Sequence, residues 1–121
     1  ELESRVRNYF NDSPFHSQID YRIGNALDII PLLDMNFDLV FIDADKENYS
    51  NYYHLIFDKV CQGGIIIADN VLWSGNILKP IHEMDTETLA LHEFNEMIQR
   101  DERVENVLFP VRDGLMVIRK K

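Results

Sequence analysis

The sequence predicts an α/β fold built on a largely parallel sheet that ends in an antiparallel hairpin. Two short apolar runs, at 39–42 and 65–68, are rich in β-branched residues, which is typical of buried parallel strands. Segments with helical periodicity alternate with these runs. The C-terminal region holds two further strand-like segments joined through Asp113-Gly114, and Asp-Gly is a strong hairpin signal.

Taken in order, the elements alternate between helix and strand. The helices are expected at 1–10, 26–33, 48–60 and 86–99, and the strands at 19–23, 39–42, 65–68, 104–109 and 115–118. Apolar residues recur at three- and four-residue spacing in the helices and alternate with polar residues in the first strand. Asn48 is expected to cap the third helix, and Gly63-Gly64 to end it and start the next strand. Five strands are therefore expected.

Size and composition exclude several classes of protein. A chain of 121 residues forms at most one domain with a real core. Its net charge of −9 argues against a nonspecific binder of nucleic acid or anionic membranes. Cys61 is the single cysteine, so no intrachain disulfide forms and a reducing cytoplasm is the expected compartment. No run approaches the length of a membrane span, and no signal peptide is expected.

Oxygen-bearing side chains follow both buried runs. Asp43 comes directly after the first, and Asp69 and Asn70 come after the second. Residues just past the carboxyl ends of neighbouring parallel strands face the same crevice, so these three are expected to converge. Carboxylate and amide oxygens without sulfur suit a hard divalent cation such as Mg²⁺. The alternative is that all three are ordinary turn or capping residues.

Three strings carry a family resemblance: "DLVFIDADKENYSNYY", "GGIIIADNVLWSGN" and "LFPVRDGLMVIRKK". In this order they resemble the cation-dependent O-methyltransferases of the catechol and caffeoyl-CoA type, from about Gly24 to the C-terminus. The resemblance implies a Rossmann-like class I methyltransferase sheet with S-adenosylmethionine as cofactor. It also implies a divalent cation, with Mg²⁺ preferred over Ca²⁺ or Mn²⁺, and a small aromatic, catechol-like acceptor.

The same resemblance implies roles for individual residues. Asp43, Asp69 and Asn70 would be the metal ligands, and Asp43 and Lys46 the catalytic residues. Lys46 matches a lysine that takes the substrate proton in the catechol branch. The alternative for Lys46 is a solvated surface lysine, because lysine is chiefly a surface residue.

Further positions match residues near the cofactor and the acceptor. The implied cofactor-binding residues are Gly24, Asn25, Ala26, Asp43, Asp45 and Tyr52. For Asp45 the alternative is a helix cap, and for Tyr52 it is core packing. Trp73 and Ser74 match the loop beside the acceptor ring, and a flat aromatic acceptor would stack well on Trp73. A Trp73 half-buried against the sheet is the alternative.

Part of the family pattern is missing from the sequence. The glycines at 24, 63, 64, 75 and 114 form no loop between an N-terminal strand and a helix. We therefore expect 1–121 to be a single, partial methyltransferase domain. It would lack the first two strands and the glycine-rich loop, and would be inactive alone. Its strand at 19–23 would lie at an open edge, either disordered or paired with a second copy in a homo-oligomer.

Two alternative functions stay open. The first is a non-catalytic, methyltransferase-like interaction module whose open sheet edge recruits a partner. The second is a methyltransferase acting on hydroxylated uridine in transfer RNA, as some bacterial members of the family do. The net charge of −9 argues mildly against this second alternative and makes a nucleic-acid partner unlikely on the sequence.

Overall fold

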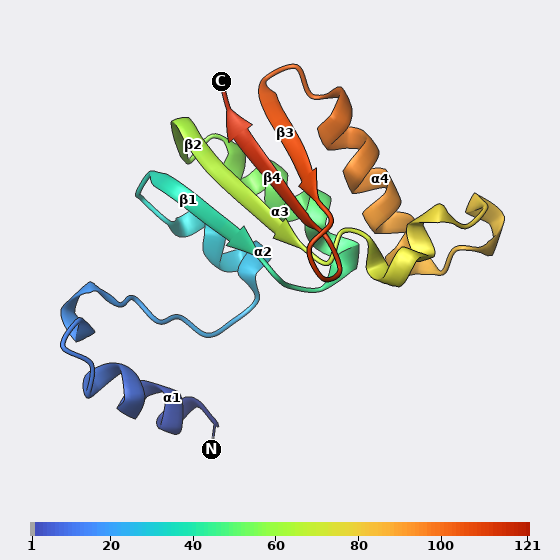
Figure 1. The fold of residues 1–121 in the computed structure, drawn as a ribbon. Coiled ribbons are helices and arrows are strands. Elements are labelled where there is room, and N and C mark those ends of the chain that lie inside the picture. Colours follow the sequence, from blue (N-terminus) through green and yellow to red (C-terminus); the bar gives the residue numbers. More distant parts are fainter. Residues whose placement is uncertain (1) are drawn as a thin grey trace.

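A mixed β-sheet forms the centre of the structure, a computed structural model that describes residues 2–121 (Figure 1). Within these residues, four strands stand in the order β1-β2-β4-β3. β1 and β2 are parallel, whereas β4 is antiparallel to both of its neighbours. The strands are β1 (Phe37–Ile42), β2 (Val60–Asp69), β3 (Val104–Phe109) and β4 (Leu115–Lys120). The predicted α/β fold with a C-terminal antiparallel hairpin is therefore confirmed.

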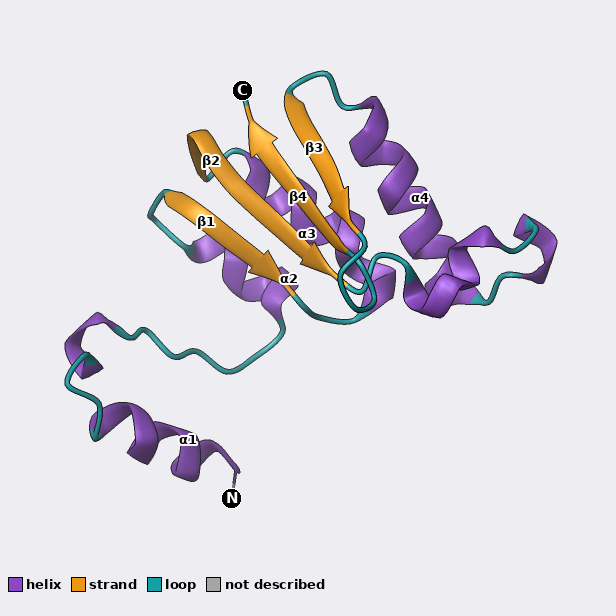
Figure 2. Cartoon of the chain, in the orientation of Figure 1, coloured by secondary structure: helices purple, strands orange, loops and turns teal. Residues whose placement is uncertain are grey.

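Helices precede the first strand and connect β1 to β2 and β2 to β3 (Figure 2). They are α1 (Leu2–Asn11), α2 (Ala26–Ile29), α3 (Tyr49–Phe57) and α4 (Thr86–Arg100). The Asp85 carboxylate caps α4 by accepting the Thr88 backbone N–H at 2.8 Å. Asn48 stands at the expected N-cap of α3, but its side chain donates to Asp45 instead of capping the helix. Across residues 2–121, no helix has the length and apolar character that crossing a membrane requires.

The core lies between one face of the sheet and the helices α3 and α4. Because side chains alternate along a strand, every second residue of β2 and β4 points to this side. Ile66, Ala68 and Ile118 are completely buried there, in one cluster with Tyr53 of α3 and Phe94 of α4. This apolar burial is the main force that holds the two helices on the sheet.

The opposite face of the sheet carries apolar side chains that no helix of the described chain covers. Leu39 and Phe41 of β1 are 59% and 54% exposed, and Val107 of β3 is 53% exposed. Their register partners on β2 and β4 place them on the same face. An uncovered apolar face next to an open strand edge is a site where further chain can pack.

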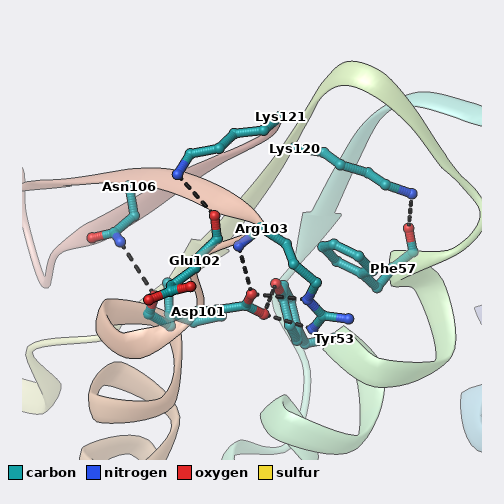
Figure 3. A network of polar contacts seen from close by, with 9 residues as sticks. Tyr53, Phe57, Asp101, Glu102, Arg103, Asn106, Lys120 and Lys121 are labelled. Carbon is teal, nitrogen blue, oxygen red and sulfur yellow. Dashed lines mark hydrogen bonds and ion pairs between the residues drawn. The ribbon is translucent and has the colours of Figure 1, made fainter.

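The C-terminal end of α3 is tied to the end of the sheet by polar contacts (Figure 3). The Tyr53 hydroxyl donates to the Asp101 carboxylate at 2.9 Å, and Arg103 Nε donates to the same carboxylate at 2.9 Å. The Arg103 guanidinium lies 4.0 Å from the centre of the Phe57 ring, while Lys120 Nζ donates to the Phe57 carbonyl at 2.8 Å. The Arg103 bond holds the pKa of Asp101 well below its usual range, and burial raises the pKa of Tyr53.

The predicted strand at 19–23 is not formed, so the expectation of five strands was wrong. These residues run extended, but they have no ladder partner among residues 2–121. A strand needs a neighbour for its backbone groups, and the alternating pattern alone supplies none. The segment belongs to an arm with α1 that stands apart from the sheet (Figure 1). Glu1, where the predicted first helix starts, lies outside the described residues.

The third helix is shorter than the predicted range of 48–60. α3 ends at Phe57, and residues 60–64, expected to close the helix, already belong to β2. A register shift lies opposite this stretch, between Phe37 and Leu39. Gly64 is needed there, because a Cβ would lie 2.8 Å from the Cys61 carbonyl oxygen. The helix at 26–33 also shortens: α2 ends at Ile29 and a 3₁₀ turn continues to Leu32.

Candidate active site

The sheet register brings the two acid-tipped strands to the same level. Ile42 of β1 pairs with Ala68 of β2, so Asp43 and Asp69 each follow the same rung of the parallel ladder. The loops that follow these strands leave the sheet at the same end (Figure 2). This end is where ligands bind in open α/β sheets.

Lys46 joins the residues at this end. Its Nζ lies 3.1 Å from Asn70 Oδ1 and 3.4 Å from Asp43 Oδ1, so the structure brings these two side chains together around one ammonium group. Lys46 is only 6% exposed. Its Nζ also lies 5.6 Å from the centre of the Trp73 ring. The solvated surface lysine, which was the alternative, is therefore wrong.

Tyr49 is a site residue that the sequence analysis missed. It is completely buried, accepts a hydrogen bond from Lys46 Nζ at 2.5 Å and donates from its hydroxyl to the Asp69 backbone carbonyl at 2.8 Å. Burial raises the pKa of the Tyr49 hydroxyl, so it remains a neutral donor near neutral pH. The sequence does contain a signal for this contact: Tyr49 follows Lys46 by three residues, and residues at that spacing share one helix face.

The third predicted metal ligand is arranged differently. Asp69 Oδ1 accepts the backbone N–H of Asn70 at 2.7 Å, and this local bond orients its carboxylate. Within residues 2–121, no cluster of three or more His, Cys, Asp or Glu side chains is found. The candidate set at 43, 69 and 70 has two carboxylates and one amide, all oxygen donors. The Lys46 ammonium sits between two of them, and oxygen donors are the kind of ligand that a hard cation takes.

Three of the implied cofactor residues line one hollow. Ala26, Asp43 and Tyr52 face a space of about 180 Å³ whose other walls are apolar. The remaining wall residues are Ile30, Val40, Phe41, Ile42, Ala44 and Ile56. An apolar hollow with a few polar groups at its rim is the usual form of a small-molecule site.

Asp45 and Tyr52 form a hydrogen-bonded pair, of which Tyr52 lines this hollow. The Tyr52 hydroxyl donates to Asp45 Oδ1 at 2.5 Å, and the Asn48 side chain donates to the other carboxylate oxygen. The Tyr52 bond lowers the pKa of Asp45. Burial and the Asp45 bond raise the pKa of Tyr52 to about 12. Asp45 makes no side-chain cap bond to the following 3₁₀ turn, so the capping alternative is not supported.

Gly24 and Asn25 have local structural tasks. Asn25 caps α2 by accepting the Leu27 backbone N–H at 3.1 Å. Gly24 has φ +153°, and a Cβ there would lie 2.9 Å from Cδ1 of Ile29. The turn therefore sets where α2 begins, and Ala26 follows directly at the hollow.

Trp73 and Ser74 lie in the segment that follows Asn70. They begin a 3₁₀ stretch, Trp73–Leu78, and both have positive φ angles, 48° and 54°. Trp73 is half-buried against the core, which agrees with the alternative given for it in the sequence analysis. Its ring also faces Lys46. The Ser74 backbone N–H donates to Asp113 Oδ1 at 2.5 Å.

Comparison with known proteins places the chain in a family. The model of a family described as O-methyltransferase matches residues 2–121. A caffeoyl-CoA O-methyltransferase of Mesembryanthemum crystallinum is 38% identical over 114 residues, which cover 85% of this chain and 45% of that protein. The SAH-bound Podospora anserina methyltransferase PaMTH1 superposes with a TM-score of 0.72 at 32% identity, covering 81% of this chain and 47% of that one. The O-methyltransferase of Bacillus cereus in complex with SAH gives 0.73 at 28% identity, covering 83% and 49%.

The chain belongs to this O-methyltransferase family. The resemblance stated from the three sequence strings is therefore confirmed at the level of the family and its fold. The chain spans about half the length of the relatives that it matches.

Proposed function

We propose that this chain forms the acceptor-binding part of an S-adenosylmethionine-dependent O-methyltransferase that methylates a hydroxyl group of a small aromatic molecule. The observation that carries the proposal is the buried Lys46, which contacts Asp43, Asn70 and the face of Trp73. Burying an ammonium group costs free energy, which contacts with oxygen atoms and an aromatic ring offset. Buried ionisable groups with such partners cluster at functional sites.

In this proposal Asp43, Asp69 and Asn70 hold a divalent cation, with Mg²⁺ preferred and Ca²⁺ or Mn²⁺ as alternatives. The support is the oxygen-only donor set at the ends of two paired strands. A bound cation of this kind polarises an acceptor hydroxyl and favours its ionised form.

Lys46 is the proposed general base: in its neutral amine form it would take the proton of the acceptor hydroxyl and become the ammonium. Its Nζ stands at the meeting point of the candidate ligands and the Trp73 ring, within reach of a hydroxyl held there. Tyr49 and Asn70 orient the ammonium head by hydrogen bonds at 2.5 and 3.1 Å. Trp73 offers its ring face to an aromatic acceptor, and Ser74 borders it.

The hollow beside β1 is the proposed place for part of the S-adenosylmethionine cofactor. Ala26, Asp43 and Tyr52 line it, and Asp45 accepts a hydrogen bond from the Tyr52 hydroxyl. Two of the superposed relatives are described as bound to SAH, which supports a related ligand for the complete protein. Because the chain spans about half of those proteins, we propose that it transfers no methyl group alone.

The test of the metal proposal uses this chain directly. Titration with Mn²⁺, followed by electron paramagnetic resonance, is expected to reveal one bound ion, and Mg²⁺ is expected to compete with it. Asp43→Asn should weaken Mn²⁺ binding by about tenfold or more, because a charged ligand is lost. The matched control is Asp38→Asn, an exposed acid on β1, the strand that Asp43 follows. Equal Mn²⁺ affinities for the two variants would contradict the proposed ligand set.

The test of the reaction uses a full-length protein that contains this chain. We expect methyl transfer to catechol or caffeoyl-CoA, and Lys46→Met should slow it by about 10²–10⁴-fold, the usual contribution of a general base. Transfer only to undermethylated transfer RNA would favour the nucleic-acid alternative. No transfer to any of these acceptors would favour a non-catalytic module, for which the uncovered face around Phe41 is the supporting observation.

A further inference from the structure

The loop after β2 has an unfavourable backbone conformation at several residues. Asn70, Trp73 and Ser74 are not glycines, yet their φ angles are 61°, 48° and 54°. A non-glycine residue in this left-handed region costs on the order of 1 kcal/mol. Such a conformation persists only when surrounding contacts enforce it. The loop carries residues of the proposed site, so the source of these contacts decides how the site is shaped.

One set of contacts comes from the β3–β4 hairpin. The Asp113 carboxylate accepts the Ser74 backbone N–H at 2.5 Å, and the Asp113 carbonyl accepts the Leu72 N–H at 2.9 Å. The Gly114 carbonyl accepts the Val71 N–H at 3.2 Å. The tip of the hairpin therefore satisfies three backbone donors of one short loop, although about 40 residues separate the two segments in sequence.

The hairpin tip also approaches the loop very closely. A Cβ on Gly114 would lie 2.5 Å from Leu72 Cγ, and Gly114 itself has φ +85°. Only glycine combines this backbone angle with so little space. The Asp-Gly pair, which predicted a hairpin turn, thus has a second task in holding the neighbouring loop.

A second contact reaches the loop from α4. The Asn95 side-chain amide donates to the Val71 carbonyl at 2.9 Å. Within the described chain, Asn95 Oδ1 is buried without a hydrogen-bond partner. Burying an acceptor in this way costs free energy, and the bond to Val71 is the contact that fixes the orientation of the amide. Asn95 thus holds the loop through a carbonyl group, whereas the hairpin holds it through N–H groups.

We propose that Asp113, assisted by Asn95, is a positioning residue that fixes the loop at 70–74 and thereby places Trp73 over Lys46. Asp113 acts through the loop backbone and contacts neither Lys46 nor the candidate metal ligands' side chains. The positioning role stands on the contacts alone. Its meaning for acceptor and metal binding rests on the function proposed above.

Trp73 provides the measurement, because it is the single tryptophan of the chain. In Asp113→Ala, we expect a red-shifted Trp73 emission, lower fluorescence anisotropy and a loss of its near-ultraviolet circular dichroism. Asp113→Asn keeps an acceptor oxygen for the Ser74 N–H and should restore most of the wild-type signal. Glu102→Ala, at an exposed acid before β3, is the matched control and should leave Trp73 unchanged.

A second variant keeps the test decisive if Asp113→Ala unfolds the chain. Asn95→Leu removes the bond to Val71 and also the unpartnered Oδ1, so the far-ultraviolet spectrum should stay native while Trp73 becomes more mobile. A Trp73 signal identical to wild type in Asp113→Ala, or in a folded Asn95→Leu, would overturn the proposal. So would an Asp113→Asn variant as disordered as Asp113→Ala.

Mn²⁺ titration separates this proposal from the proposed function. If both hold, Asp113→Ala weakens Mn²⁺ binding by about tenfold, the usual effect of removing a residue that orients metal ligands. If the wild-type chain binds no Mn²⁺ while Trp73 still responds to Asp113→Ala, the metal site fails and the positioning role stands.

Discussion

The loop after β2 and the arm before α2 meet the sheet in opposite ways. The loop donates hydrogen bonds to the β3–β4 hairpin, accepts one from Asn95 of α4, and keeps three residues in a costly conformation. The arm contains an extended stretch at 19–23 whose alternating apolar pattern is typical of a strand. This stretch has no strand partner among the described residues. The difference teaches that sequence pattern proposes a conformation, whereas long-range contacts determine whether it is held.

Hydrogen exchange should give the largest contrast between these regions. The amides of Ile66 and Ala68 in β2 should exchange at least about a thousandfold more slowly than those of 19–23, because central strands open only by global unfolding. Strong protection of 19–23 in a verified monomer would contradict the description of the arm. Protection that grows with protein concentration would instead support pairing of the open edge with a second copy.

Among the substitutions near the loop after β2, Gly114→Val should destabilise the protein most. The new side chain would meet Leu72 and adopt φ +85°, so we expect the free energy of unfolding to fall by about 2–4 kcal/mol. Urea denaturation measures this change. Gly75→Ala is the matched control: its φ is +80°, but nothing lies within 4 Å of the new Cβ, so only about 1 kcal/mol should be lost. Equal losses would show that close approach does not matter.

Asp101 tests the polar contacts at the end of α3. Its pKa is lowered by Arg103, so its stabilising effect is complete above the usual aspartate range and is lost as pH falls through the lower, folded-state value. Asp101→Asn should cost about 1–2 kcal/mol near pH 7, and the difference from wild type should shrink in acid. Denaturation at several pH values measures it. A difference that grows in acid would contradict the assignment.

The Tyr52→Phe substitution should have the smallest effect on the stability of the fold. The pKa of Tyr52 is raised to about 12 by burial and by the bond to Asp45, so its stabilisation is complete below the ordinary tyrosine pKa and is lost as pH rises towards about 12. Ultraviolet titration should show one tyrosine fewer ionising late in Tyr52→Phe. A late-ionising tyrosine signal that is unchanged in Tyr52→Phe would contradict the Asp45 pairing.

The sequence predicted those parts of the fold and site that follow from local rules. β-branched runs located β1 and β2, and the rule that ligands gather at the carboxyl ends of parallel strands brought Asp43 together with Asn70. Asp113 was seen only as part of a turn, because its bond to Ser74 depends on how the hairpin packs. The strand at 19–23 failed for the same reason, since pairing requires a neighbour that no local pattern supplies.

The strand order has a consequence for how the sheet is assembled. β3 is synthesised before β4, but it pairs with β4 alone, and β4 enters between β2 and β3. Until β4 has been synthesised, β3 therefore has no strand to pair with, and the sheet beside α4 is incomplete. β4 pairs with β2 and β3 on its two sides, and the turn before it carries Asp113 to the loop after β2. Placement of the central strand and shaping of the candidate site thus depend on the same hairpin.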